Sequence, residues 1–280
     1  MPTRGGKVPA WLSGGLVCAA FATLVWWERR RPLREAVEPK LRRNVRNLAV
    51  AGLSAVALQL AASPVLQPLA RQVERRRWGL LQRRRLPLWL EVPLALVLLD
   101  YSIYLWHVLT HKTPFLWRFH RVHHVDLDLD ASTALRFHFG EMVISVAWNA
   151  TEILLLGITP LALSVRQTFL LVNILFHHSD VRLPLETERR LNRFLVTPRM
   201  HGIHHSIVPE ETASNWSSGL SIWDRLHGTL RLGIPQDEIT IGIPAFRDPR
   251  EVTLPKVLAM PFGEQRLTNL LPDGTRPARN

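Results

Sequence analysis

Residues 107–124 read HVLTHKTPFLWRFHRVHH, and this stretch decides how the rest of the chain is interpreted. On a helix, His107 and His111 are four residues apart and share one face, so both imidazoles can point at one ion. A second group follows at helical spacings of three and four residues: His120, His123 and His124. Two such groups in succession predict a metal site rather than isolated structural histidines.

Further histidines strengthen this prediction. The HxxHH spacing returns as His201, His204 and His205, and the pair His177-His178 ends an apolar segment. Eleven of the twelve histidines fall between His107 and His205. Burying so many imidazoles without a shared partner would leave ring nitrogens unsatisfied, whereas metal ions satisfy them together. Since one tetrahedral ion takes at most four ligands, eight or more histidines predict two ions.

Long apolar runs place this cluster in a membrane protein. No charge occurs over 8–27, and further mostly apolar runs cover 47–70, 86–109 and 142–176, the last interpreted as a helical hairpin. A run of about 20 residues spans a hydrocarbon layer of about 30 Å. We therefore expect an all-α integral membrane protein with four to five transmembrane or half-spanning helices and a His-rich di-metal cap.

Three regions follow from this pattern. Residues 1–99 are expected to form membrane helices with basic loops, 100–230 the histidine-bearing region, and 231–280 a polar tail. The net charge is +12 and 47% of the residues are hydrophobic, and the basic runs flank the apolar spans. This favours membrane anchoring and excludes a nucleic-acid partner. The single Cys18 excludes disulfide frameworks and multi-cysteine metal sites.

The donor set indicates redox chemistry. The peptidase motifs HExxH and HxxEH are absent, as are the ExxH pairs of soluble di-iron bundles. A pair of irons held by imidazoles alone would suit activation of dioxygen against an unactivated C–H bond.

These residues resemble a known family, the fatty acid hydroxylase / sterol desaturase superfamily of integral membrane non-haem di-iron oxygenases. The resemblance covers about residues 100–229. Its motifs are DY at 100–101, YLWHVLTH at 104–111, LWRFHRVHH at 116–124, STALRFH at 132–138, FHHSD at 176–180, TPRMHGIHH at 197–205 and NWSSGLSIWDRLHGT at 215–229.

The resemblance implies two non-haem irons, O2 as co-substrate and a lipid substrate, sterol-like or fatty acyl, that is hydroxylated or desaturated. The implied iron ligands are His107, His111, His120, His123, His124, His178, His201, His204 and His205. Four residues of the motifs are further candidates as ligands or as hydrogen-bond partners of ligands: His138, His177, Asp180 and Asn215.

The resemblance also implies a cap that faces the cytoplasm, and we expect a multi-pass protein of a bacterial inner membrane. Since no HPGG haem motif occurs, electrons must come from a separate donor, either a ferredoxin, a cytochrome b5-like protein or a reductase. Loop charge alone leaves the orientation open, because 29–46 carries eight Lys or Arg and 71–85 carries seven. A partly re-entrant arrangement would relieve the conflict with a strongly basic outer loop.

Acidic residues beside the motifs have two interpretations. Asp100 lies two helical turns before His107 on the same face, and with Glu141 and Asp224 it is a candidate partner for a ligand's second ring nitrogen. Asp126 fits either this role or that of a loop charge. Asp128 and Asp130 are interpreted as solvated loop charges.

Two alternative functions remain from the sequence. A non-catalytic metal-binding membrane protein would bind metal without consuming O2. A membrane acyltransferase would use the HxxxxD pair of His123 and Asp128, which leaves the other histidines unexplained.

Overall fold

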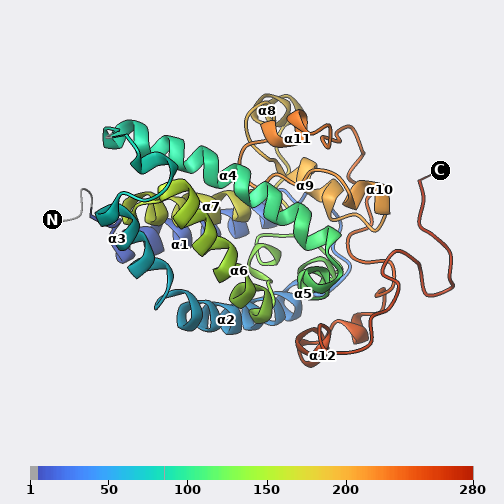
Figure 1. The fold of residues 1–280 in the computed structure, drawn as a ribbon. Helices are drawn as coiled ribbons and strands as arrows, with labels where there is room; N and C mark the ends of the chain where they lie inside the picture. The colour runs from blue at the N-terminus through green and yellow to red at the C-terminus, as the bar shows by residue number, and fades with distance from the viewer. Residues whose placement is uncertain (1–5, 85, 280) are drawn as a thin grey trace.

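The computed structural model describes residues 6–84 and 86–279, and the chain is helical as expected (Figure 1). The described residues form no β-strand, only three isolated bridges. Four segments are long and apolar enough to cross a membrane: Ala10–Arg30, Lys40–Gln82, Leu88–Lys112 and Phe139–Gly157. Most residues in these windows are not buried by protein, so their apolar outer faces suit a lipid surrounding.

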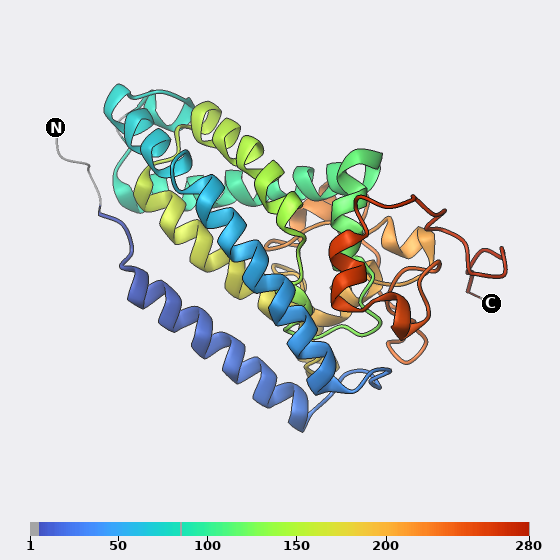
Figure 2. The same cartoon turned by 90° about the horizontal axis from the view of Figure 1, so that it is seen from below.

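The bundle is built from five long helices. They are α1 (Ala10–Arg30), α2 (Lys40–Ala62), α4 (Leu88–Lys112), α6 (Phe139–Glu152) and α7 (Pro160–His178). Helix α2 packs on α6, while α1 and α4 pack on α7 (Figure 2). The expected hairpin at 142–176 falls on α6 and α7, joined by the π-helical turn η3 (Ile153–Gly157). Thr159 caps α7 and Pro160 begins it, which explains the sharp restart after η3.

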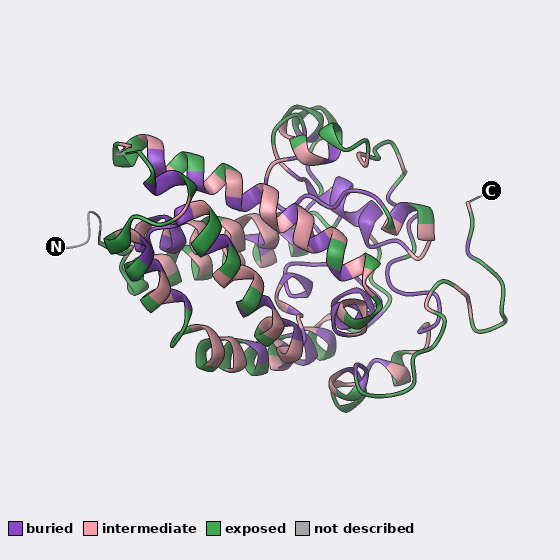
Figure 3. Ribbon diagram, viewed as in Figure 1, coloured by how far each residue is buried: buried purple, intermediate pink, exposed green. Residues whose placement is uncertain are grey.

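The short helices gather at one end of this bundle and form a cap. They are α5 (Pro114–His124), α8 (Leu185–Leu191), α9 (Pro198–His204), α10 (Pro209–Thr212), α11 (Ile222–Leu226) and α12 (Leu254–Ala259), with the 3-10 turns η2 (Thr133–Leu135) and η4 (Pro249–Glu251). Figure 3 shows the buried residues concentrated in this cap, around α5 and α9, while the bundle helices carry exposed outer faces.

The opposite end of the bundle, here called the far end, is closed by α3 (Leu66–Arg76) and the 3-10 turn η1 (Leu80–Gln82). Gly79 and Gly157 both have positive φ and touch, since a Cβ on Gly79 would lie 2.3 Å from the Gly157 nitrogen. Gln82 donates through Nε2 to the Gly157 carbonyl at 3.0 Å. The turn after α3 is therefore fastened to the α6–α7 hairpin.

A buried ionic network fastens the cap to α2. Arg43 donates to Asp126 at 3.0 Å and to Asp130 at 2.6 Å, and Arg46 pairs with Glu38 at 2.6 Å. The expectation that Asp128 and Asp130 are solvated was wrong, because they are only 8% and 2% exposed. Asp128 accepts the backbone N–H groups of residues 37 and 38 at 2.7 and 2.9 Å, which accounts for its burial.

We expect Arg43→Gln to destabilise the protein by ~3 kcal/mol, because it leaves two buried carboxylates without their shared cation. Thermal unfolding in detergent measures the change. Arg42→Gln, an exposed neighbour on the same helix, is the matched control and should be near neutral. Equal unfolding temperatures for the two variants would contradict the role given to the network.

Candidate metal centre

Four helix ends bring nine histidines together inside the cap. The end of α4 carries His107 and His111, and the end of α7 carries His178. The remaining six come from two short helices, His120, His123 and His124 from α5 and His201, His204 and His205 from α9 and its C-cap. All are buried, His111 partly so. Pro114 and Pro198 start α5 and α9, so each HxxHH motif sits at a fixed distance from a helix N-terminus.

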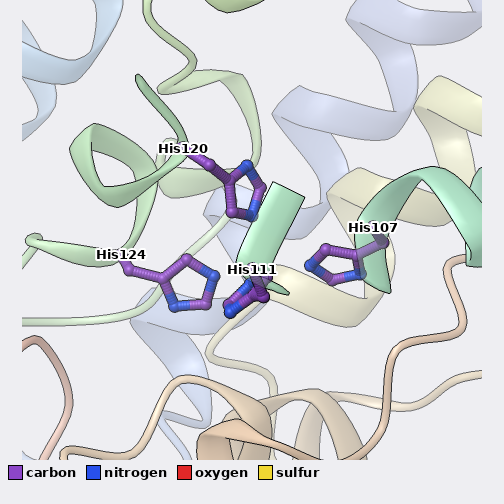
Figure 4. A group of neighbouring side chains, drawn as sticks. All are labelled: His107, His111, His120 and His124. Atoms are coloured by element: carbon purple, nitrogen blue, oxygen red, sulfur yellow. The ribbon is translucent and has the colours of Figure 1, made fainter. Parts of the chain in front are cut away.

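The first group consists of His107, His111, His120 and His124, whose rings converge in Figure 4. Each offers one ring nitrogen, and these nitrogens all lie within 4.8 Å of one another. The ring of His204 borders the same group, with centroid distances of 4.6 Å to His107 and 4.8 Å to His124. This group is therefore large enough to surround one ion.

The second group consists of His123, His178, His201 and His205. Nε2 of His178 lies 3.0 Å from Nε2 of both His123 and His201, and Nε2 of His205 lies 3.1 Å from that of His201. Two ligands at right angles around an ion, each about 2.1 Å from it, would be about 3.0 Å apart. The spacing thus matches adjacent ligand positions around a second ion.

Unpartnered nitrogens show that the donor set fits metal. Buried polar atoms in proteins almost always have a hydrogen-bond partner. Eight buried ring nitrogens of these histidines have none: His111 Nε2, His120 Nε2, His123 Nδ1, His124 Nδ1 and Nε2, His201 Nδ1, His204 Nε2 and His205 Nδ1. The group of His124, His204 and His205 also connects the two main groups, so the two ion positions would be neighbours.

Hydrogen bonds outside the groups orient four of the rings through Nδ1. Glu141 Oε1 accepts from His120 Nδ1 at 2.9 Å, and Glu141 is the only one of the four acceptors that is a side chain. The other three acceptors are backbone carbonyls: Trp216 for His107 at 2.7 Å, Ser214 for His204 at 2.9 Å and Ile174 for His178 at 2.9 Å. A proton held at Nδ1 leaves Nε2 as the free donor atom, directed into the cluster.

Sequence reasoning missed these three carbonyl partners, because any residue type supplies a carbonyl. Only an indirect signal for the Trp216 carbonyl was present in the sequence, namely the acidic residue Asp224 in the same motif. Its carboxylate accepts the N–H groups of Trp216 and Ser217 at 2.8 and 2.9 Å and so holds the segment whose carbonyl meets His107. Asp100 accepts from the Leu220 N–H at 2.9 Å and from Trp223 Nε1 at 2.7 Å. Both acids therefore position the 216–223 segment, and neither bonds to a histidine in the described contacts.

The four further candidates lie outside the two convergent groups. Both ring nitrogens of His138 are engaged, with the Gly140 N–H and the Leu258 carbonyl. Asp180 pairs with Arg34, and burial raises the pKa of its carboxyl to about 7. Asn215, at φ 56°, bonds to backbone groups of residues 200 and 231. His177 lies beside His201, with ring centroids 4.2 Å apart.

The pair needed by the acyltransferase alternative is not assembled. His123 faces His178, and Asp128 binds the backbone at residues 37 and 38. No described hydrogen bond joins the two residues, so a general base oriented by a carboxylate is missing at this position.

Burial keeps the cap imidazoles uncharged. Desolvation lowers the pKa of His204 to about 3, and desolvation followed by repulsion from neighbouring imidazoles lowers the pKa of His123, His124, His201 and His205 well below 6.5. Neutral imidazole is the form that binds metal, so the cluster is ready for an ion near neutral pH.

The fold is that of a helical membrane protein, and its cap holds two groups of histidines, each of which could hold a metal ion. The model of the family described as "Fatty acid hydroxylase" matches residues 92–229, which include every histidine of the two groups. This region of the chain belongs to that family, within the fatty acid hydroxylase / sterol desaturase superfamily expected from the motifs.

Curated relatives match about half of the chain. The ornithine lipid hydroxylase OlsE of Rhizobium tropici is 33% identical over 56% of this chain and 46% of its own length. Alkylglycerol monooxygenase of Xenopus tropicalis is 30% identical over 50% of this chain and 29% of its own length. Cholesterol 25-hydroxylase of Mus musculus is 31% identical over 50% of this chain and 46% of its own length. The match thus spans less than half the length of each of these relatives. No solved structure matches the chain significantly.

We predict that the loaded protein binds two metal ions, one in each group. His111→Ala and His205→Ala should each lower the content by about one equivalent, because each removes a ligand from a different group. Inductively coupled plasma mass spectrometry of the purified protein measures this content. His138→Ala should retain both ions, since its two ring nitrogens already have partners. A loss of metal in His138→Ala as large as in His111→Ala would contradict the assignment.

Metal-free protein should lose stability as the medium becomes acidic. Since the folded-state pKa of His204 is about 3 and its ordinary value is 6.5, the unfolded chain binds the extra proton first. The free energy of unfolding should fall between these pH values by ~1.4 kcal/mol per pH unit for this residue. Denaturant titrations of the metal-free protein across this pH range measure the slope. His204→Gln should have a shallower slope, and unchanged slopes would contradict the burial of a neutral ring.

Proposed function

We propose that the protein is a membrane oxidoreductase that uses O2 and two non-haem irons to hydroxylate a lipid. The observation that carries the proposal is the convergence of nine histidines on two adjacent positions at one end of a membrane-sized helix bundle. The names of the relatives support the same reaction class, since they are lipid hydroxylases and a monooxygenase.

The proposed iron ligands fall into two sets. One is His107, His111, His120, His124 and the bordering His204, and the other is His123, His178, His201 and His205. When bound there, the irons would supply the redox chemistry that activates dioxygen against an unactivated C–H bond.

The chain's own residues would orient the ligands and exclude water. Glu141 holds the His120 proton at Nδ1, and the Trp216 carbonyl holds that of His107. Aromatic rings surround the cluster, with Trp216 4.6 Å from His111 and Phe137 stacked 4.5 Å from His123. Such a shell lowers the local polarity and limits solvent access, both of which tune a metal site.

Hydroxylation is the preferred outcome over desaturation because each named relative is a hydroxylase or monooxygenase. The balanced reaction takes a C–H bond, O2, two electrons and two protons, and yields an alcohol and water. The substrate would be a membrane lipid, sterol-like or fatty acyl. The electrons would come from a separate ferredoxin, cytochrome b5-like protein or reductase, for which a basic cap suits an acidic carrier.

We further propose that the cap faces the cytoplasm of a bacterial cell, with the bundle in the inner membrane. The relative in Rhizobium tropici supports a bacterial setting. Charge supports the orientation once the helix directions are known, because the end of α1, the start of α2 and the chain after α7 all lie at the cap. The cap end carries these basic residues near the helix ends: Arg29, Arg30, Arg31, Arg34, Lys40, Arg42, Arg43, Arg46, Arg182, Arg189, Arg190 and Arg193. These twelve basic residues outnumber the seven arginines of the 71–85 loop. The positive-inside rule therefore supports a cytoplasmic cap without a re-entrant arrangement.

Lipid mass spectrometry of expressing cells tests the reaction. We expect a lipid that gains 16 mass units, whereas a loss of two would indicate desaturation. His123→Ala should abolish the product, and Glu141→Gln should lower turnover by about 10- to 100-fold because it loosens the His120 ring. Gln265→Ala, exposed in the tail, is the control for expression.

A different pattern would favour the non-catalytic alternative. Two irons per chain without any O2 consumption or lipid product, with a reductant present, would indicate a metal-binding protein. Iron below one equivalent after reconstitution, or full lipid oxidation by His123→Ala, would refute the di-iron proposal itself.

A further inference from the structure

The far end of the bundle, where Figure 1 shows α3 opposite the metal cap, carries a group of exposed basic residues. We call it the far-end collar, and it consists of six exposed arginines on α3 and the turn that follows: Arg71, Arg75, Arg76, Arg77, Arg83 and Arg84. Arg85 belongs to the same run in the sequence and lies outside the described residues. The collar is far from the histidines, so the proposed oxidation leaves it without a role.

Helix α3 presents two opposite faces. Leu66, Ala70 and Val73 are buried in a hydrophobic cluster that includes Ile153 and Leu163 of the α6–α7 hairpin. The arginines of α3 lie on the exposed side of the same helix. Because the apolar face of α3 is used in packing on the bundle, its cations face away from the protein core.

The cap buries and pairs some of its arginines, whereas the collar pairs none within the described residues. At the cap, Arg43 and Arg46 are buried and paired with carboxylates. Among the described residues, no ion pair involves any arginine of the collar, and Arg77 donates only to the backbone carbonyl of Gln82. Six exposed guanidinium groups without an ion pair give this end a positive potential, which favours an anionic partner from outside the chain.

Exposed aromatic and aliphatic side chains accompany the collar. Trp78 is 42% exposed, Leu80 53% and Trp89 76%. Tryptophan favours the boundary between headgroups and hydrocarbon, where its ring is apolar and its N–H remains wet. The mixture of arginine and tryptophan therefore fits a lipid interface better than the surface of a soluble acidic protein.

The collar is held rigidly before any partner binds. The contact between Gly79 and Gly157 and the hydrogen bond from Gln82 to the Gly157 carbonyl lock the turn after α3 onto the hairpin. Arg77 itself ends α3 in the left-handed conformation, at φ 57°, which turns the chain sharply at this point. Because the backbone that carries the arginines is already fixed, lipid binding would not have to order this turn.

We propose that the far-end collar binds the headgroups of anionic phospholipids in the leaflet opposite the metal cap. Guanidinium groups pair with phosphate oxygens through two parallel hydrogen bonds, and neighbouring cations favour lipids with net negative charge over zwitterionic ones. The bound lipids would fix the depth of the α6–α7 hairpin, whose other end carries Glu141 and His178.

The test uses the full-length protein purified in a neutral detergent, with phosphatidylglycerol and phosphatidylcholine as probes. Native mass spectrometry counts bound lipid, and thermal unfolding reports stabilisation by each lipid. We expect the wild-type protein to retain and be stabilised by phosphatidylglycerol only. The variant Arg71→Gln/Arg75→Gln/Arg76→Gln should bind it about a hundredfold more weakly, about fivefold for each arginine near the surface.

Two control variants test whether lipid binding depends on positive charge at the collar itself or only on the net charge of the protein. Arg189→Gln/Arg190→Gln/Arg193→Gln removes the same charge from exposed positions at the cap and should keep wild-type affinity. Arg71→Lys/Arg75→Lys/Arg76→Lys keeps the charge and should keep most of the binding, which shows that α3 still folds. Equal losses in the collar and cap variants, or equal binding of both lipids by the wild-type protein, would overturn the proposal.

Discussion

The structure depends on one constraint, which is that many imidazoles must be buried together and kept uncharged. Water cannot satisfy their nitrogens inside the cap, and protein groups satisfy only some of them, since eight remain without a partner. In the proposed di-metal centre this cost is offset on the condition that ions occupy the space between the rings. Two groups of four histidines with His204 between them meet that condition for two ions.

The rest of the cap serves to hold these rings in place. Asp224 fixes the segment whose Trp216 carbonyl orients His107, and Asp100 fixes the same segment from α4. On the other side, the Arg43 network joins α2 to the loop that follows α5. Buried acids that bind no histidine thus still help to orient His107, because they hold the backbone segment whose carbonyl contacts its ring.

Charge is arranged so that the two ends of the bundle differ. Buried cap arginines such as Arg43 and Arg46 are paired with internal carboxylates, whereas the collar arginines are exposed and form no ion pair among the described residues. A lipid enzyme needs its metal centre at a constant depth relative to the substrate, since oxidation of one C–H bond demands close positioning. Lipid binding at the collar, as proposed, would provide this constancy.

The sequence by itself determined the helical class, the membrane runs and the metal-binding residue types, because helical periodicity is local and His107 and His111 share a face whatever surrounds them. Only the tertiary structure decided which motifs share an ion, since His123 joins His178 and His205 across long sequence separations while its neighbour His124 faces the other group. It also decided that Asp130 is buried and that backbone carbonyls orient three ligands, because burial and carbonyl direction depend on packing and leave no trace in residue type.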